Sequence, residues 1–392
     1  MASFVRIDKP SRLEILGACS RFREQVADNI VRQPCPKLPA SDSRRIHHAA
    51  RKASMRHSIL LIGSLLSGIV FVSGCSSEPT AAVPSPSPNS TDSVSSAKSI
   101  DDVELALNWL PEAEHGGFYA ADVHGLFAER HLKVKIISGG PGVPVIQNVA
   151  TGKVTFGVTN ADQVLLQRAQ EADVVVVFAP IQQSPRCIMV HKKSGITRFD
   201  DLKNMTLLIK ANQTFLGYLR KKLPLTNVQI VDYAGSIGPF LQDERLGQQA
   251  YVFSEPFQVA EQGAEPVNLM LSDIGFNPYT SVLITRAEVI AKQPELVRRM
   301  VEACRLGWRK YLDEPEQTNA QIHSLNKEMS LEILAFGTRT LKPLCESGLS
   351  SPEKLGEMNA ERWTTLAEQL VEAGALKSGA GDPSQAFDIS FQ

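Results

Sequence analysis

The chain has 392 residues, of which 43% are hydrophobic and 21% are charged, and this balance is typical of a globular protein. The first 74 residues carry 12 Lys and Arg against 5 Asp and Glu, a balance of +7, and because the whole chain sums to −1, the remainder sums to −8. An acidic main portion lacks the basic surface that nucleic-acid binding requires, so we expect no nucleic-acid partner.

A short apolar segment, residues 59–72, follows Arg56 and leads into Ser-Gly-Cys, ending at Cys75. A basic start, a short apolar run and small residues at the end are typical of a signal peptide, and the run is too short to span a bilayer, which takes about 20 residues. Residues 72–75 are similar to the bacterial lipobox, in which the Cys is acylated and becomes the new N-terminus. We therefore expect a lipoprotein signal peptide over 55–75 with lipidation of Cys75; a plain secretory signal is the alternative.

The segments on either side of this signal show no folding pattern. Residues 1–54 are rich in Arg and lack sustained periodicity, so we interpret them as a disordered or mis-assigned N-terminal extension, with a long basic start of the signal as the alternative. Residues 76–99 consist mainly of Ser, Pro and Ala and cannot bury enough apolar surface to offset their chain entropy. They are expected to form a disordered linker, with the folded part beginning near Ile100.

From Ile100 onward, strand-like and helix-like segments alternate, which indicates an α/β fold. Continuous Val runs such as 174–178 favour parallel strands that are covered on both faces. The expected strands are 103–107, 132–137, 155–158, 174–178, 187–191, 206–210, 228–232, 251–253 and 281–285. Helices are expected at 116–130, 143–150 and 161–170, around residues 201, 219, 240 and 259, and through most of 287–375.

Two extended segments that contain Pro, 179–185 and 276–279, separate two such α/β units. Two crossings of this kind are typical of a two-lobed, hinged binding protein with its ligand cleft between the lobes. We expect residues 100–182 plus 280–392 to form lobe 1 and residues 183–279 to form lobe 2, with the helical C-terminal segment packing on lobe 1. Because ligands of open α/β sheets bind beyond the carboxyl ends of the strands, the site is expected in the loops that follow them.

The loop after the first strand, residues 108–119, carries several candidate ligand-binding side chains. Trp109 offers a flat face to a stacked ring or a cation, and a core position is its alternative role. His115 precedes two glycines at an expected helix N-terminus, where backbone donors point outward, and capping of that helix is its alternative role. Tyr119 belongs to the same segment and is a further candidate.

Four candidates follow later strands or lie at a crossing. Asn160 and Asp162 come directly after the third strand, where they could contact a ligand or cap the next helix. Glu255 stands before a Pro after the strand at 251–253, and its carboxylate could bind a ligand or cap a helix. Tyr279, at the second crossing, could close over the ligand or pack the hinge.

The segment 107–127 contains Asn-Trp-x-Pro, His-Gly-Gly-Phe-Tyr-Ala-Ala and Gly-Leu-Phe. It resembles the solute-binding family that contains formylaminopyrimidine-binding proteins and the fungal thiamine-pyrimidine synthases, a group that also includes nitrate- and alkylsulfonate-binding proteins. Later segments are similar to the same family, namely 152–157, 253–256, 277–280 and 295–311. The resemblance covers about residues 102–375 and implies the two-lobed, type II periplasmic-binding-protein fold.

In the pyrimidine-binding members an aromatic side chain stacks on the ring and a carboxylate binds its amino group, and Trp109 and Glu255 fall at matching positions. The resemblance implies an exported, lipid-anchored substrate-binding component of an ABC importer, facing the periplasm and acting as a monomer with permease and ATPase subunits. A thiamine pyrimidine precursor or a similar small heteroaromatic is the expected ligand. An oxyanion such as nitrate, sulfonate or taurine is the alternative, with Arg186 and Lys210 as its only candidate partners, and a sensory or adaptor module is a third possibility.

The residues that make the fungal synthases self-consuming enzymes are a donor His, a Lys and a Cys-rich iron-binding segment. In this chain Gln163 and Thr159 stand where the His and the Lys are expected, and residues 272–276 contain no Cys. We therefore expect a non-enzyme without a cofactor or a metal, and a synthase-like enzyme is the alternative.

Three cysteines fall in the expected folded part: Cys187, Cys304 and Cys345. Their spacing matches neither CxxC nor a metal site, so neither a zinc site nor a disulfide framework is predicted. Because three is odd, at least one thiol is expected to be free and buried, and a Cys304–Cys345 bridge is an alternative.

Overall fold

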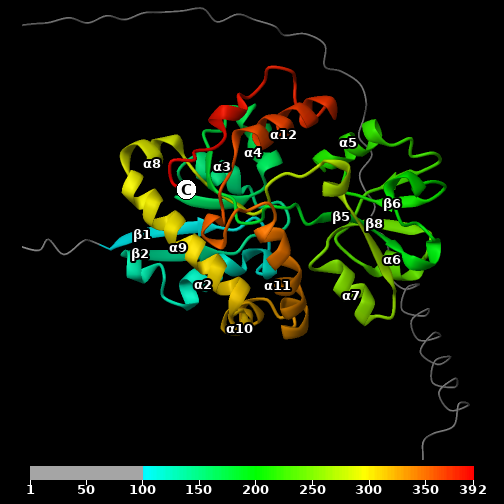
Figure 1. Cartoon of the computed structure of the whole chain (residues 1–392), viewed down its shortest axis with the longest axis horizontal. Coiled ribbons are helices and arrows are strands. Elements are labelled where there is room, and N and C mark those ends of the chain that lie inside the picture. Colours follow the sequence, from blue (N-terminus) through cyan, green and yellow to red (C-terminus); the bar gives the residue numbers. More distant parts are fainter. Residues whose placement is uncertain (1–99) are drawn as a thin grey trace, which may run out of the picture. The chain divides into compact units, whose positions relative to one another are not determined.

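The computed structural model describes residues 100–392; the extension, signal peptide, lipidation site and linker predicted at 1–99 lie outside the described residues. Its strands form two separate five-stranded sheets (Figure 1). The first sheet has the order β2-β1-β3-β10-β4, with β1 Asp101–Ala106, β2 Leu132–Ile137, β3 Phe156–Thr159, β4 Val175–Phe178 and β10 Val282–Thr285. The second has the order β7-β6-β8-β5-β9, with β5 Arg186–His191, β6 Thr206–Leu208, β7 Gln229–Val231, β8 Leu246–Tyr251 and β9 Pro266–Met270.

Both sheets are mixed, and each contains one reversed strand. β1 runs parallel to β2 and β3, and β6 runs parallel to β7 and β8, whereas β10 and β5 are antiparallel to both of their neighbours. The reversed strand is the first one after each crossing between the sheets. Each crossing leaves one sheet at the carboxyl ends of its parallel strands and enters the other sheet at the corresponding edge. The next strand therefore starts at that edge and runs opposite to its neighbours. The expectation of parallel strands is therefore wrong for β5 and β10.

Two strands of the second sheet differ from the sequence prediction. β9, Pro266–Met270, is absent from the expected strands, and β8 begins at Leu246 rather than near Tyr251. The sequence of β8, Leu-Gly-Gln-Gln-Ala-Tyr, lacks alternating apolar residues, so its pattern does not predict a strand. The strand forms because it pairs with β5 on one side and β6 on the other. β9 starts at a Pro, which a sheet tolerates in an edge strand because no inward N–H is needed.

The α-helices fall where the sequence predicts them, except that α2 is shorter than expected and that a three-residue 3-10 helix, Phe199–Asp201, stands where a helix around residue 201 was expected. The first group is α2 Gly116–Val123, α3 Val145–Ala150, α4 Ala161–Arg168, α5 Thr214–Lys222, α6 Gly238–Gln242 and α7 Glu255–Glu261. The C-terminal group is α8 Ala287–Lys292, α9 Pro294–Asp313, α10 Glu316–Leu325, α11 Leu331–Glu346 and α12 Ala360–Glu372. α2 ends at Val123 because Gly125 adopts φ +72°, a left-handed conformation that stops a helix.

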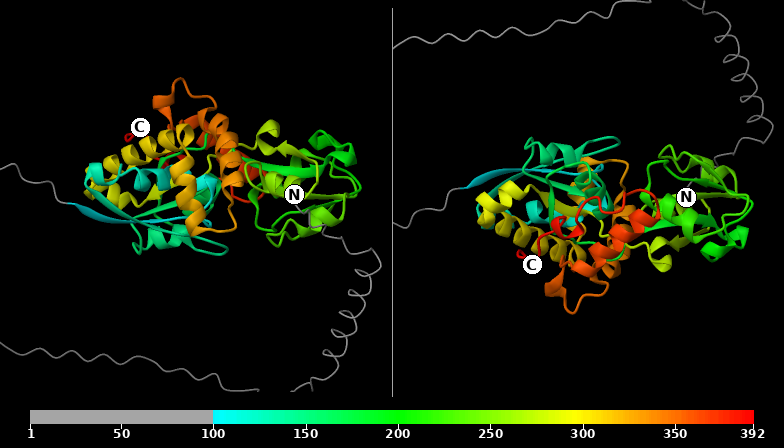
Figure 2. Two further views of the ribbon diagram at one scale, coloured as in Figure 1. Left: turned by 90° about the horizontal axis from the view of Figure 1, so that it is seen from below. Right: turned by 90° about the horizontal axis from the view of Figure 1, so that it is seen from above.

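Below, the first unit is the part of the protein that contains the first sheet, and the second unit is the part that contains the second sheet. The C-terminal helices pack mainly on the first unit. The yellow helices α8 and α9 lie alongside the cyan strands in every view (Figures 1 and 2), and α9 packs closely on α2. Two of these helices also reach the second unit: α11 contacts α7, and α12 contacts both α4 of the first unit and α5 of the second. One hydrophobic cluster accordingly contains Val176 of β4, Val190 of β5 and Trp363 of α12. The two units thus share a continuous apolar core near the crossings.

Cys187, Cys304 and Cys345 are all buried and carry free thiols, so the alternative of a Cys304–Cys345 bridge is wrong. Burial raises the pKa of the Cys304 and Cys345 thiols. No helix within residues 100–392 has the length and apolar character that a bilayer crossing requires.

Candidate functional site

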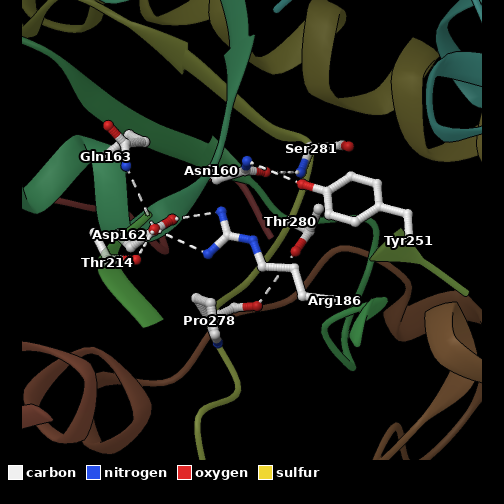
Figure 3. Close-up of polar contacts among 9 residues, drawn as sticks. All are labelled: Asn160, Asp162, Gln163, Arg186, Thr214, Tyr251, Pro278, Thr280 and Ser281. Carbon is white, nitrogen blue, oxygen red and sulfur yellow. Dashed lines mark hydrogen bonds and ion pairs between the residues drawn. The ribbon is translucent and has the colours of Figure 1, made fainter. Parts of the chain in front are cut away.

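The carboxyl ends of β1 and β3 carry a cluster of polar side chains, and β5, β6 and β8 bring further polar side chains to the same place. Figure 3 shows part of this cluster, with Asp162 and Asn160 of the first unit facing Arg186, Thr214 and Tyr251 of the second. Arg186 lies here because β5 is reversed: its first residue pairs with Tyr251, the last residue of β8. Both units thus contribute side chains to the region beyond the carboxyl ends of the strands, where the sequence predicts the site.

The loop after β1 forms a buried hydrogen-bonded group around Glu114. Ser281 Oγ donates to Glu114 Oε2 at 3.2 Å, and Asn108 Nδ2 lies 3.5 Å from Glu114 Oε1. His115 Nε2 lies 3.1 Å from Asn108 Oδ1 and 3.3 Å from Glu114 Oε1. Burial lowers the pKa of His115 to about 3, so the ring is neutral and its Nε2–H donates to Asn108.

Ser281 reaches Glu114 from an unfavourable backbone conformation. Its φ is +53°, in the left-handed region that a Ser rarely adopts, and the residue is fully buried. Its backbone N–H donates to Asn160 Oδ1 at 3.2 Å, and its hydroxyl donates to Glu114. Such strain is stored where the surrounding contacts fix the residue, as they do at this end of the second crossing.

Three carboxyl groups from two different loops influence one another at this site. Burial raises the pKa of Glu112 well above its ordinary value, and the charges of Glu114 and Glu255 raise it further. Burial also raises the pKa of Glu114 to about 7, although hydrogen bonds from Ser281 and Asn108 oppose this. Burial raises the pKa of Glu255 as well, although the Tyr251 N–H donates to its Oε2 at 2.9 Å. The candidate site therefore gathers three carboxyl groups with raised pKa values, and the Glu114 carboxyl protonates near neutral pH.

Two tyrosines of the second unit border these carboxyl groups. Burial raises the pKa of Tyr233, and the nearby charges of Glu255 and Glu112 raise it further. Burial raises the pKa of Tyr251 to about 12. Asn160 Nδ2 donates to Tyr251 Oη at 3.3 Å, which joins the loop after β3 to the end of β8 (Figure 3).

Asp162 is fully occupied by partners from the second unit. Arg186 donates through Nη1 to Asp162 Oδ2 at 2.9 Å and through Nη2 to Oδ1 at 3.1 Å, and Thr214 Oγ1 donates to Oδ2 at 2.6 Å (Figure 3). Burial by itself raises the pKa of Asp162, but the Arg186 charge and these hydrogen bonds outweigh it and keep the pKa below its ordinary value. Asp162 is therefore a carboxylate that connects the two units.

Trp109 is half-buried, and a cation of the second unit lies over its ring. The Lys210 ammonium is 5.4 Å from the centroid of the Trp109 ring, within the range of a cation–π interaction. The Lys210 backbone N–H donates to Gln249 Oε1 at 2.8 Å, so β8 holds the loop that carries the ammonium. Trp109 and Lys210 come from loops after β1 and β6, on the expected site edge.

Two of the candidates from the sequence lie in packed surroundings. Tyr119 is 3% exposed within the apolar cluster around α2. Tyr279 is 1% exposed: the Arg362 guanidinium lies 3.8 Å from its ring centroid, and its Oη accepts from the Asn359 N–H at 3.2 Å. Tyr279 thus packs the second crossing against the start of α12, the second of the two roles considered for it.

Four residues that the sequence did not indicate as site residues lie at the candidate site: Glu112, Glu114, Ser281 and Tyr251. Glu112 and Glu114 were detectable in principle, because they stand in the same loop as Trp109 and His115. Tyr251 ends its strand, but the strand was expected to begin there. Ser281 gave no signal, since its approach to Glu114 spans 167 residues of sequence. Within residues 100–392, no group of three or more His, Cys, Asp and Glu is arranged to hold a metal ion.

Comparisons with known proteins agree with this architecture. A family model described as "NMT1/THI5 like" matches residues 112–318, more than half of the chain. The riboflavin-binding protein RibY of Chloroflexus aurantiacus is 25% identical over 352 residues, which cover 86% of this chain and 98% of that protein. The formylaminopyrimidine-binding protein of Halalkalibacterium halodurans is 21% identical over 316 residues, 78% of this chain and 92% of that protein.

Among solved structures, the periplasmic aliphatic sulphonate binding protein SsuA of Escherichia coli superimposes with a TM-score of 0.58 at 15% identity, covering 73% of this chain and 91% of that one. At this identity the likeness concerns the fold alone. It confirms the two-lobed α/β fold expected from the sequence.

Proposed function

Because the chain belongs to the NMT1/THI5-like family of solute-binding proteins, we propose that it is the extracytoplasmic binding component of an ABC importer and that it binds a flat, uncharged nitrogen heterocycle. The ligand class is that of thiamine pyrimidine precursors and flavins. Two relatives support this choice, since one is named for binding formylaminopyrimidine and the other for binding riboflavin. Both ligands are planar rings whose edges carry hydrogen-bond donors and acceptors.

The observation that carries the proposal is the group of Glu112, Glu114 and Glu255, two of which follow Trp109 in the segment after β1. Burial raises the pKa of all three, and it raises that of Glu114 to about 7, so at Glu114 both the charged and the protonated carboxyl are available near neutral pH. A carboxylate accepts a hydrogen bond from an amino or imide N–H, and a protonated carboxyl donates to a ring nitrogen. The ring edge of an aminopyrimidine or flavin offers both kinds of group, and the indole of Trp109 offers a stacking face.

In this proposal the ligand enters while the two units are apart and is enclosed when they rotate together about the crossings. Trp109 and His115 of the first unit, together with Glu255 and Tyr251 of the second, would then surround it. Asn160 and Asp162 would hold the two units together rather than contact the ligand. The permease and ATPase subunits of the importer would be the protein partners.

An oxyanion remains the competing ligand, because the fold is shared with a sulphonate-binding protein and Lys210 places an ammonium over Trp109. Each of the carboxyl groups of Glu112, Glu114 and Glu255 that is ionised repels an anion electrostatically. A synthase-like enzyme has less support: Gln163 Nε2 lies 3.5 Å from Asp162 Oδ2, and an amide is neither a nucleophile nor a base at neutral pH.

A thermal-shift titration of the purified protein tests the ligand class. The panel is an aminopyrimidine, riboflavin, nitrate and taurine. At a hundredfold excess over Kd a ligand adds about 2.7 kcal/mol, which raises the melting temperature by roughly 5–10 °C. A shift with a heterocycle supports the proposal, and a shift with nitrate or taurine alone contradicts it.

Two substitutions test the residues placed around the ligand. Trp109→Ala and Glu255→Gln are each expected to weaken heterocycle binding at least tenfold, because they remove the stacking face and one carboxylate. Calorimetric titration measures Kd, and the melting temperature without ligand is the control. Glu255→Gln keeps an oxygen that can accept from the Tyr251 N–H, so its fold should persist. A protein that loses its cooperative melt on Trp109→Ala would show that Trp109 is a core residue.

Export and lipid anchoring through Cys75 complete the proposal and rest on the sequence of the signal segment. Two acyl chains hold a protein stably on a membrane, whereas one does so only marginally. Metabolic labelling with radioactive palmitate in a bacterial host is expected to label the wild-type chain and to leave Cys75→Ser unlabelled and released from the membrane. Equal labelling of both chains would exclude this anchor.

A further inference from the structure

Arg186 is the only lysine or arginine of residues 100–392 that is buried, with 4% of its surface exposed. It lies at the first residue of β5, on the edge where the loops of both units meet. Its charge acts on the neighbouring Glu114 carboxyl, whose pKa it lowers against the effect of burial. A positive charge at this position would attract an anionic ligand.

The positive charge of Arg186 is neutralised by Asp162 in a two-pronged ion pair. Both guanidinium Nη atoms donate, one to each carboxylate oxygen, at 2.9 and 3.1 Å. The Asp162 side chain is 0% exposed and that of Arg186 5% exposed, so water does not screen the pair. Planar guanidinium and carboxylate groups fit each other in this geometry.

The other contacts of Asp162 keep the carboxylate in place. Thr214 Oγ1 donates to Oδ2 at 2.6 Å, and Asp162 stands in the first turn of α4, whose first residue, Ala161, donates its N–H to Tyr279 O at 3.0 Å (Figure 3). The carboxylate is therefore tied to the second unit through Arg186 and Thr214 and to the second crossing through α4. An anionic ligand could not displace it without breaking three charge-assisted hydrogen bonds.

We propose that Asp162 is a specificity-determining residue, which neutralises Arg186 at the base of the site and thereby excludes anionic ligands. This inference rests on the proposed function, because it explains how the chain takes an uncharged heterocycle on a fold that it shares with a sulphonate-binding protein. The residue acts through Arg186 and not by touching the ligand. Whether the site accepts a neutral or an anionic ligand then depends on the Asp162 carboxylate.

The test is Asp162→Asn, which keeps the shape and one acceptor oxygen but removes the charge. Binding of methanesulfonate and nitrate is measured by calorimetric titration, in a buffer that contains neither sulfonates nor much chloride. Compared with the wild type, the variant is expected to gain at least tenfold in affinity for both anions, which corresponds to about 1.4 kcal/mol. The matched control is the double variant Asp162→Asn/Arg186→Gln, which lacks both charges of the ion pair and should gain nothing.

Asp162→Asn leaves a buried arginine without its partner and could prevent folding. Refolding in methanesulfonate is then compared with refolding in an uncharged osmolyte at equal osmolality. The anion is expected to restore a cooperative melt to Asp162→Asn and to have no such effect on the double variant.

Two results would overturn the inference: no gain in anion affinity or anion-dependent folding in Asp162→Asn, or an equal gain in the double variant, which would place the anion elsewhere. The proposed function is judged separately, from the binding of heterocycles by the wild-type protein. If the wild-type protein binds no heterocycle, the proposed function is wrong, whatever the affinity of the variants for anions.

Discussion

At the scale of single residues, burial shifts the pKa values of Glu114 and His115, so that each is uncharged at pH values at which it would be charged in water. The Glu114 carboxyl group has a pKa of about 7, and its neighbour His115 has a pKa of about 3. Both groups are uncharged over part of the pH range in which the unfolded chain would charge them. The two shifts have opposite effects on stability, so the contribution of Glu114 has to be isolated by substitution.

We expect Glu114→Gln to change the pH dependence of folding stability. The folded protein keeps the Glu114 proton up to about pH 7, whereas the ordinary value for Glu is 4.5, so unfolding between these pH values releases a proton. The stability of the wild type relative to Glu114→Gln should therefore fall as the pH rises from 4.5 to 7 and be constant above that. Urea titrations from pH 4.5 to 8 measure this difference.

The contribution of His115 has the opposite sign. Its pKa of about 3 lies below the ordinary 6.5, so its contribution to stability is lost as the pH falls below 6.5. Because His115 is present in both proteins, its effect cancels in the comparison. Parallel stability curves for the wild type and Glu114→Gln would contradict the raised pKa.

Gln248, in the middle of β8, is a buried amide that pairs across the sheet with Met189 of β5 and Leu208 of β6. It is 0% exposed, and neither its Nε2 nor its Oε1 has a hydrogen-bond partner among residues 100–392. An unpaired buried polar group costs about 1–3 kcal/mol. Gln248→Met, which keeps the length of the side chain, is therefore expected to raise the free energy of unfolding by about 1 kcal/mol in urea titrations.

The adjacent residue is the matched control. Gln249 Oε1 accepts the Lys210 N–H at 2.8 Å, so Gln249→Met removes a hydrogen bond that is made. It should lower the free energy of unfolding by about 1 kcal/mol. If both substitutions are destabilising to the same extent, the assignment of Gln248 as an unpaired amide is wrong.

At the scale of secondary-structure elements, the contact between α2 and α9 explains the two glycines that follow His115. A Cβ on Gly116 would lie 2.0 Å from the Tyr311 ring, and one on Gly117 would lie 2.0 Å from the Trp308 ring. On the other helix, a Cβ on Gly307 would lie 2.3 Å from the Gly117 carbonyl oxygen. These glycines allow the helices to approach closely, and the aromatic rings of α9 fill the space over α2.

Gly307→Ala is therefore expected to destabilise the protein. Helix propensity alone favours Ala over Gly by about 1 kcal/mol, so the sign of the change distinguishes packing from propensity. We expect a loss of at least 2 kcal/mol, because the clash is with backbone atoms and the helices must separate. Gly238→Ala at the start of α6, where the nearest atom is the Ser236 hydroxyl at 3.3 Å, should change the melting temperature little.

At the scale of the whole molecule, the two units meet through an apolar core and polar contacts near the crossings, and through an aromatic pair farther away. Phe257 of α7 and Phe336 of α11 lie with their ring centroids 5.2 Å apart. Such a pair contributes about 0.5–1.5 kcal/mol beyond the area that it buries. Because its rings belong to different units, it stabilises the arrangement in which they are together.

We expect Phe336→Ala to weaken heterocycle binding about 3- to 10-fold, since part of the contact that holds the units together is lost. Small-angle scattering of the ligand-free variant should show a larger radius of gyration than that of the wild type. Phe387→Ala is the control: its ring stacks on Trp363 with centroids 5.4 Å apart, away from the α7–α11 contact. It should lower the melting temperature without changing the radius of gyration.

Local sequence patterns determined the α/β class, the two crossings and the strand edge at which the candidate site lies. Alternation and apolar runs are properties of residues close together in the sequence, and they can therefore be recognised without the tertiary structure. The observed β2 matches its predicted range, and α4 differs from its predicted range only at its end. The family motifs in the loop after β1 indicated Trp109 and His115 for the same reason, because both stand within a few residues of their strand.

Only the tertiary structure decided which side chains meet. Asp162 appeared in the sequence as a ligand contact or a helix cap, but its partner Arg186 comes from the other unit and depends on the reversed direction of β5. Glu114 is linked to Ser281 only because the chain returns to the first sheet through the second crossing. Such contacts follow from how the two sheets dock, and no periodicity or spacing along the chain encodes that geometry.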